Sequence, residues 1–124
     1  MSPQDTILIT GLELYAFHGA SDEEQTIGHR YQVEVRLTVN IESAIQSDSL
    51  EDTVNYAEVA LALQRVATTR QFRLLEALAG EMIAAIFAQF PAVLAVWIRV
   101  QKRLPPFPAI VDTVGVELTR DRIE

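Results

Sequence analysis

The sequence predicts one α+β domain, in which four antiparallel strands form a sheet and two helices cover one of its faces. Three patterns in the 124 residues support this prediction. Apolar residues alternate with polar ones in four segments, apolar residues recur at helical spacing in two others, and glycine or proline lies in three of the five connections between them. The segments follow the order β-β-α-α-β-β, and two helices can cover one face of such a sheet. We expect residues 1–124 to form this single domain, because the length is typical of one.

The first two segments are long strands that we expect to pair as a hairpin. Residues 6–18 alternate, but the apolar parity changes at Gly11, which is typical of a β-bulge. Residues 30–42 contain six consecutive apolar–polar repeats, which indicate one buried and one wetter face. Residues 19–29 between them are expected to be a polar loop that two glycines close.

Two helices are expected after a polar and acidic connection at residues 43–54. The first covers about 56–69, because Asn55 followed by Glu58 is typical of a capping box. The second covers about 74–90, where apolar residues recur at helical spacing until a proline ends the helix. The apolar positions of the two helices are Val59, Leu63, Val66, Leu75, Leu78, Ala79, Met82, Ile83, Ile86, Phe87 and Phe90.

The last two segments, residues 94–103 and 112–120, are expected to be strands. A proline-rich stretch at 104–108 separates them and excludes helix or central strand there. By the parity of the third strand, Lys102 continues its apolar row.

The outer edges of such long strands can pair with other chains. One way to satisfy them is edge-to-edge pairing with copies of the same chain, which closes a barrel. We therefore expect an obligate homo-oligomer, with the polar face of the strand at 30–42 lining the barrel lumen.

The composition excludes or disfavours several classes of function. The chain has no cysteine, which excludes disulfides, thiolate zinc sites and cysteine nucleophiles. The net charge is −7 and no basic run is present, which disfavours nucleic-acid binding. No apolar run approaches the roughly 20 residues that cross a bilayer, and no secretory leader is visible. We therefore expect a cytoplasmic protein without a membrane partner.

Four residues at the ends of predicted elements could carry chemistry, namely Glu24, Tyr56, Glu76 and Lys102. Lys102 is the only lysine among ten basic residues, and lysine loses its proton on burial more readily than arginine. Each residue also has a structural interpretation. Glu24 belongs to an acidic run that is typical of a solvated loop, Tyr56 could pack at a helix start, Glu76 could complement a helix dipole, and Lys102 could snorkel.

These residues lie within stretches that resemble the dihydroneopterin aldolase family of the folate pathway. The stretches are Tyr-Ala-Phe-His-Gly-Ala at 15–20 with Glu24, Asp-Thr-Val-Asn-Tyr-Ala-Glu at 52–58, Leu-Leu-Glu-Ala-Leu-Ala at 74–79, Lys102 with Pro-Pro-Phe-Pro at 105–108, and Val-Gly-Val at 114–116. They occur in order and at matching spacing between about Thr6 and Arg120. The family often has glycine after the last proline, where this chain has Ala109.

The resemblance implies the tunnelling fold, in which four chains close a barrel and two such rings usually stack into an octamer. It implies cleavage of a small pterin, 7,8-dihydroneopterin, into 6-hydroxymethyl-7,8-dihydropterin and glycolaldehyde at sites between neighbouring chains. Many members also epimerise the side-chain hydroxyl. The conjugated C=N system of the pterin can accept the electrons of the broken bond, so we expect no metal, cofactor or Schiff base.

The resemblance also implies roles for single residues. Lys102 is the principal acid/base, Tyr56 of the neighbouring chain takes part in proton delivery onto the product, and Glu24 contacts the substrate and assists proton transfer. Glu76 anchors the pterin, because its carboxylate can accept from the amino and N–H donors of the ring. The implied substrate-binding set is Glu24, Val54 as a wall, Tyr56, Leu75 through its backbone, and Glu76.

Three alternatives remain at this point. Dihydroneopterin triphosphate epimerase has the same fold but tends to lack the Lys-x-x-Pro-Pro pattern that Lys102, Pro105 and Pro106 supply. Pyruvoyl-tetrahydropterin synthase holds zinc with three histidines, whereas this chain has two. A non-catalytic pterin-binding module would need Glu76 but would have little use for a single desolvated lysine.

Overall fold

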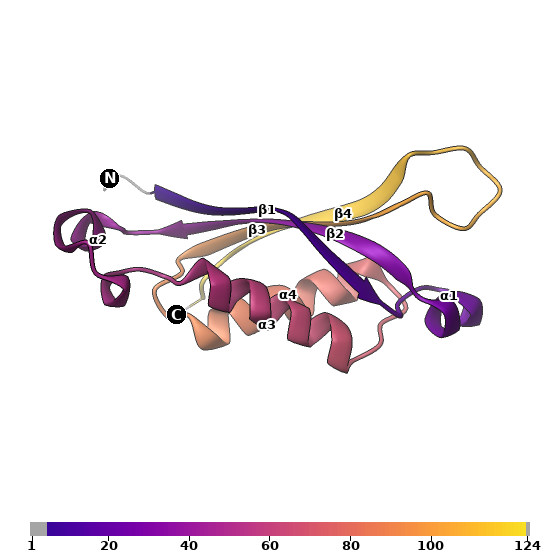
Figure 1. The fold of residues 1–124 in the computed structure, drawn as a ribbon, viewed down its shortest axis with the longest axis horizontal. Coiled ribbons are helices and arrows are strands. Elements are labelled where there is room, and N and C mark those ends of the chain that lie inside the picture. The colour runs from indigo at the N-terminus through magenta and orange to yellow at the C-terminus, as the bar shows by residue number, and fades with distance from the viewer. Residues whose placement is uncertain (1–4, 124) are drawn as a thin grey trace.

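A four-stranded sheet with two helices on one face forms the body of the molecule (Figure 1). The computed structural model describes residues 5–123. Its elements are β1 (Asp5–Ala16), α1 (Asp22–Ile27), β2 (His29–Val39), α2 (Glu42–Ser47), the 3-10 turn η1 (Leu50–Asp52), α3 (Tyr56–Thr69), α4 (Leu75–Gln89), β3 (Ala95–Arg103) and β4 (Thr113–Asp121). The predicted α+β class and the order of the main elements are confirmed.

The strands lie in the order β1-β2-β3-β4, and all neighbouring pairs are antiparallel. Helices α3 and α4 lie together on one face of the sheet (Figure 1). Among the described residues, β1 is hydrogen-bonded only to β2 and β4 only to β3, so each outer strand keeps one free edge. Such edges are where another chain can pair.

The predicted β-bulge at Gly11 is confirmed. The pairing of β1 with β2 shifts register between Ile9 and Leu12, and Gly11 has a φ of 68°, which glycine adopts without strain. The extra residue turns the second half of β1 over. Apolar side chains of both parities, such as Ile9 and Leu14, therefore reach the same core.

The core lies between the sheet and the two helices, as the alternation and helical spacing predict. β2 and β3 carry continuous rows of buried side chains, and Lys102 continues the row of β3. The buried hydrophobic positions of these four elements are Tyr31, Val33, Val35, Leu37 and Val39 on β2, Val96, Ile98 and Val100 on β3, Val59, Ala62, Leu63 and Ala67 on α3, and Leu78, Ala79, Met82, Ile83 and Ile86 on α4.

Both predicted connections contain short helices, so the prediction of a polar loop at residues 19–29 was wrong. Residues 19–29 include α1, and residues 43–54 include all but the first residue of α2 and the whole of η1. Helices of six residues or fewer are too short to show an apolar period. A capping box does mark α1: Ser21 Oγ accepts from Glu24 N–H at 3.2 Å, and a Glu24 carboxylate oxygen lies 3.4 Å from Ser21 N–H.

Some predicted boundaries also differ. Asn55 caps α3 by accepting from Ala57 N–H at 3.0 Å, but among the described residues Glu58 does not return the second bond of a capping box. β1 ends at Ala16 rather than at 18, because His18 leaves the sheet and turns into the core. β2 ends at Val39 rather than at 42, because α2 begins there.

Candidate functional site

Two of the predicted residues meet directly, although they are 78 positions apart in the chain. Lys102 Nζ donates to Glu24 Oε2 at 2.5 Å. Only 11% of the Lys102 side chain and 14% of the Glu24 side chain are exposed. Lys102 is the last residue of the buried row of β3, near the C-terminal end of that strand. Helix α1, which carries Glu24, lies at the same end of the sheet (Figure 1). The two side chains therefore form an ion pair that is largely withdrawn from water.

The position of Glu24 is fixed by its own short helix. Its carboxylate accepts from the Ser21 hydroxyl at 3.2 Å with one oxygen, while the other oxygen faces Lys102. Gly19 leaves the necessary room, because a β-carbon there would lie 2.4 Å from the Glu24 β-carbon. Asp22 and Glu23 are exposed. The solvated-loop interpretation therefore holds for these two residues and is wrong for Glu24.

The charge of Glu24 follows from its surroundings. Burial raises the pKa of this carboxyl, but hydrogen bonds from Lys102 and Ser21, together with the Lys102 charge, outweigh burial and hold the pKa below its usual 4.5. Glu24 is therefore a carboxylate at neutral pH. The pair places an amine and a carboxylate side by side at one site, which is an arrangement suited to general acid/base chemistry.

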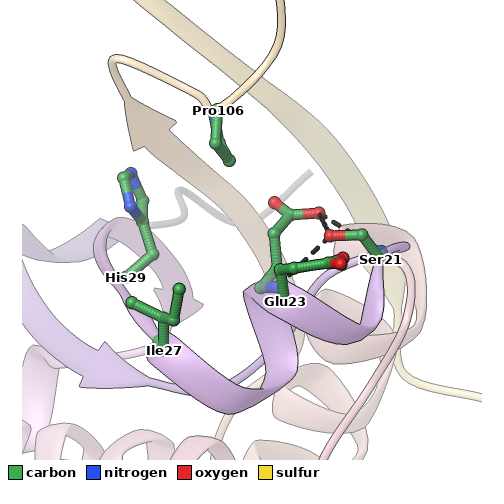
Figure 2. Close-up of a pocket in the computed structure, with 7 residues that line it drawn as sticks. Ser21, Glu23, Ile27, His29 and Pro106 are labelled. Atoms are coloured by element: carbon green, nitrogen blue, oxygen red, sulfur yellow. Dashed lines mark hydrogen bonds between the residues drawn. The ribbon is translucent and has the colours of Figure 1, made fainter.

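A cavity of about 470 Å³ opens beside this pair. Figure 2 shows Ser21, Glu23 and Ile27 along one side, with His29 at the start of β2 and Pro106 opposite α1. Glu24 also lines the cavity. The proline-rich connection after β3 and the helix α1 are thus two walls of one space, and Glu24 joins this space to Lys102.

Leu75 and Glu76 lie at the same end of the molecule, in the first turn of α4. The connection that precedes them is tied to the start of α1: Gly19 N–H donates to Phe72 O at 3.0 Å, and Arg73 donates to Ala20 O at 3.3 Å. Glu76 is exposed and Leu75 is half-buried. Both residues are therefore accessible to a ligand that approaches this end.

Tyr56 and Val54 lie at the N-terminal end of α3, which is the end away from Glu24 and Lys102. Ala67, near the other end of α3, accepts a hydrogen bond from His18 beside the Glu24 site. Tyr56 lies eleven positions before Ala67, which is about 16 Å along the helix axis. Val54 is buried, Tyr56 is 64% exposed, and both line a second, apolar cavity of about 400 Å³. Within one chain the structure thus divides the predicted residues into two groups, one at each end.

His18 and Tyr31, for which the sequence patterns predict no role, are both buried beside the site. His18 Nδ1 accepts from Phe72 N–H at 3.0 Å, and its Nε2 donates to Ala67 O at 2.8 Å. The ring is therefore neutral, and burial is the main cause that lowers its pKa, with a further contribution from the Lys102 charge. A tyrosine in an otherwise aliphatic buried row was the available signal, since a buried hydroxyl needs a partner.

Two further properties concern metals and membranes. Among residues 5–123, no three His, Asp or Glu side chains are arranged to hold a metal ion. In the same part of the chain, no helix combines the length and the apolar character needed to cross a bilayer. That the reaction requires no metal or cofactor stays a prediction.

Comparison with known proteins gives one consistent result. A family model described as dihydroneopterin aldolase matches residues 7–119. A dihydroneopterin aldolase of Streptococcus pyogenes serotype M18 is 36% identical over 118 residues, which are 95% of this chain and 99% of the relative.

Two solved structures share the fold over nearly the whole chain. A Vibrio cholerae chain assigned to the same enzyme superposes with a TM-score of 0.87 at 30% identity, covering 95% of this chain and 98% of that one. Escherichia coli dihydroneopterin aldolase, solved in complex with neopterin, has a TM-score of 0.87 at 27% identity, covering 94% and 98%.

The neutral state of His18 predicts a loss of stability in mild acid. The unfolded chain takes up a proton at this residue near pH 6.5, whereas the folded chain does so only at lower pH. The unfolded state therefore binds more protons in that interval, and the free energy of unfolding falls as the pH falls below about 6.5. The contribution of Glu24 is lost only in a lower interval, below 4.5.

Urea unfolding at pH 7.5 and 5.5 measures this effect. His18→Asn should be less stable than the parent at pH 7.5 but should show a smaller further loss at pH 5.5. An equal loss in parent and variant between the two pH values would contradict the assignment.

Proposed function

The chain belongs to the dihydroneopterin aldolase family, and we propose that Glu24 and Lys102 form its acid/base centre. The protein is a carbon–carbon lyase that cleaves 7,8-dihydroneopterin into 6-hydroxymethyl-7,8-dihydropterin and glycolaldehyde. The observation that carries the proposal is the 2.5 Å contact between Lys102 Nζ and Glu24 Oε2 beside a cavity of about 470 Å³. The decisive assay is incubation of the protein with dihydroneopterin and measurement of glycolaldehyde.

The reaction needs one proton removed and one proton delivered. A base takes the proton of the hydroxyl on the second side-chain carbon, the bond between the first and second carbons breaks, and glycolaldehyde leaves. The electron pair of that bond enters the conjugated C=N system of the pterin. The first carbon then receives a proton and becomes the hydroxymethyl group. Lys102, held by Glu24, accepts the first proton as a neutral amine, after its ammonium group has released a proton, and Tyr56 takes part in delivering the second.

The same site accounts for epimerisation. If glycolaldehyde turns over before it leaves and the carbon–carbon bond forms again on its other face, the second side-chain carbon is inverted. We propose that the monapterin isomer accumulates as a side product during turnover. A chain that forms this isomer without any glycolaldehyde would instead be an epimerase.

Glu76 is suited to anchor the pterin ring. Its carboxylate lies at the N-terminal end of α4 and is exposed, so it can accept from the amino and N–H donors of the ring as a charge-assisted pair. The backbone at Leu75 lies beside it. The neopterin bound to the relative from Escherichia coli presents the same pattern of ring donors.

The residues at the other end of α3 are proposed to serve the site of a neighbouring chain. One chain cannot place Tyr56 beside its own Lys102, because about 16 Å of helix separates Tyr56 from Ala67 at the Glu24 end. Pairing of the free edge of β1 with the free edge of β4 in the next copy would close a ring. We propose a tetrameric ring, or an octamer of two rings, in which Tyr56 and Val54 complete the neighbouring pocket.

Lys102→Arg should keep the charge and the fold but lose most of kcat, by about 10²–10⁴-fold, because arginine does not give up its proton near neutral pH. Product affinity should change much less. Borohydride added during turnover should leave the mass of the parent unchanged, because no Schiff base forms. Near-normal kcat in the variant would show that only the charge is needed, and a reduced adduct on Lys102 would show a Schiff-base mechanism.

Glu76→Ala should weaken product binding by about 2–5 kcal/mol, because it removes one partner of a desolvated charged pair. Helix α4 should persist, since the lost dipole interaction is worth only about 0.3–1 kcal/mol. Glu81→Ala on the same helix is the matched control, because Glu81 pairs with Arg70 at the surface and should not affect affinity. Titration calorimetry that finds equal product affinity in all three proteins would reduce Glu76 to a helix-dipole residue.

A mixture of two inactive variants tests the shared site. Lys102→Arg and Tyr56→Phe chains, co-expressed in equal amounts, should form mixed rings in which about a quarter of the sites combine an intact Lys102 with an intact Tyr56. Activity of the mixture should therefore exceed that of either variant alone. If sedimentation finds folded monomers, or if mixing restores no activity, Tyr56 does not act across chains.

A further inference from the structure

The residues that this chain gives to the site are connected through one buried side chain. His18 is 1% exposed and lies directly after β1, before the loop that leads to α1. Its Nδ1 accepts from Phe72 N–H at 3.0 Å, in the connection that leads to α4. Its Nε2 donates to Ala67 O at 2.8 Å, near the end of α3. The imidazole thus joins the α1 side of the site to both helices.

Tyr31 fixes the backbone of His18 to the sheet. Its hydroxyl accepts from His18 N–H at 3.1 Å and donates to His18 O. Tyr31 is fully buried and stands directly opposite Lys102 in the register of β2 and β3. Burial raises the pKa of Tyr31 to about 12, so the hydroxyl remains a donor at neutral pH. The loop that carries α1 is therefore attached to the sheet next to Lys102.

One other bond between the start of α1 and the connection before α4 is also buried, from Gly19 N–H to Phe72 O at 3.0 Å, and the rest lie nearer the surface. Gln71 Nε2 donates to Gln25 O at 3.1 Å, and Arg73 pairs with Asp22 at 3.6 Å. Exposed contacts of this kind hold a geometry weakly, whereas a buried and fully satisfied network holds it tightly. The position of the connection relative to α1 is therefore set mainly by the two buried bonds of Phe72, of which the bond from Phe72 N–H to His18 Nδ1 is the one that a side chain makes.

We propose that His18 is a positioning residue for the aldolase reaction. Through Phe72 N–H it sets where the first turn of α4, with Glu76, stands relative to the pair of Glu24 and Lys102. This inference rests on the proposed function for the roles of these three residues. A displacement of about 1 Å between an anchor and an acid/base group can cost about 10²-fold in rate. The competing interpretation is that His18 only contributes to stability.

Two substitutions separate the two bonds of the imidazole. In His18→Asn the side-chain oxygen takes the place of Nδ1 and can still accept from Phe72 N–H. In His18→Gln the amide nitrogen takes the place of Nε2 and can still donate to Ala67 O, but Phe72 N–H loses its acceptor. Each variant therefore keeps one bond and loses the other.

The measured quantities are the affinity for 6-hydroxymethyl-7,8-dihydropterin, by calorimetry, and kcat and KM for dihydroneopterin. His18→Gln should raise the product Kd and KM by about tenfold or more, and His18→Asn should stay within about threefold of the parent, since only the Asn variant retains the bond to Phe72. Val35→Ala, a cavity in the middle of β2, is the control for general loss of stability and should leave all three constants unchanged. Unchanged constants in folded His18→Gln, or an equal effect of Val35→Ala, would overturn the proposal.

Tyr31→Phe provides a second measurement if His18→Gln does not fold. It removes the attachment of the loop to β2 and keeps the bonds of the imidazole. It should therefore lower kcat, through Glu24 and Lys102, by about tenfold or more while product affinity changes less. Parental kcat in this variant would overturn the proposal. Failure of the proposed function would be seen in a different measurement, because the parent would then release no glycolaldehyde. Product binding is measured without turnover, so the test of His18 does not depend on that assay.

Discussion

The ion pair between Glu24 and Lys102 is the constraint around which the end of the molecule with the candidate site is arranged. Withdrawing two charges from water costs several kcal/mol per ion, and this cost is offset only by close contact and by hydrogen bonds to the remaining lone pairs. Lys102 extends an apolar row of β3, so without Glu24 it would be an unpaired charge near the core. The short helix α1, the Ser21 cap and the small Gly19 all place the carboxylate where that charge requires it.

The parts of the fold that repeat over many residues were predictable from the sequence. The bulge at Gly11, the buried rows of β2 and β3 and the apolar faces of α3 and α4 each follow from a period that a long segment displays. The short helices were not predicted, because six residues show no period. The row of β3 predicted that Lys102 would be buried, but its contact with Glu24 depends on tertiary packing across 78 positions. The bonds of His18 to backbone atoms are equally invisible in sequence spacing.

The division of the predicted residues between the two ends of α3 would give the proposed oligomer a functional reason. Glu24, Lys102, Leu75 and Glu76 gather at one end, and Tyr56 with Val54 lies at the other. The free edges of β1 and β4 provide a means of bringing the two ends of different chains together. Assembly would thus satisfy the sheet edges and complete the pocket in one step, so that stability and activity depend on the same contacts.

A double-mutant cycle on kcat is the most direct test that Glu24 and Lys102 act as one unit. The four proteins are the parent, Glu24→Gln, Lys102→Met and the double variant, compared by glycolaldehyde release under saturating dihydroneopterin. Residues that act as a unit show strongly non-additive losses. We predict that the double variant loses no more activity than the more damaged single variant. Losses that multiply, as they do for independent groups, would contradict the central place given to this pair.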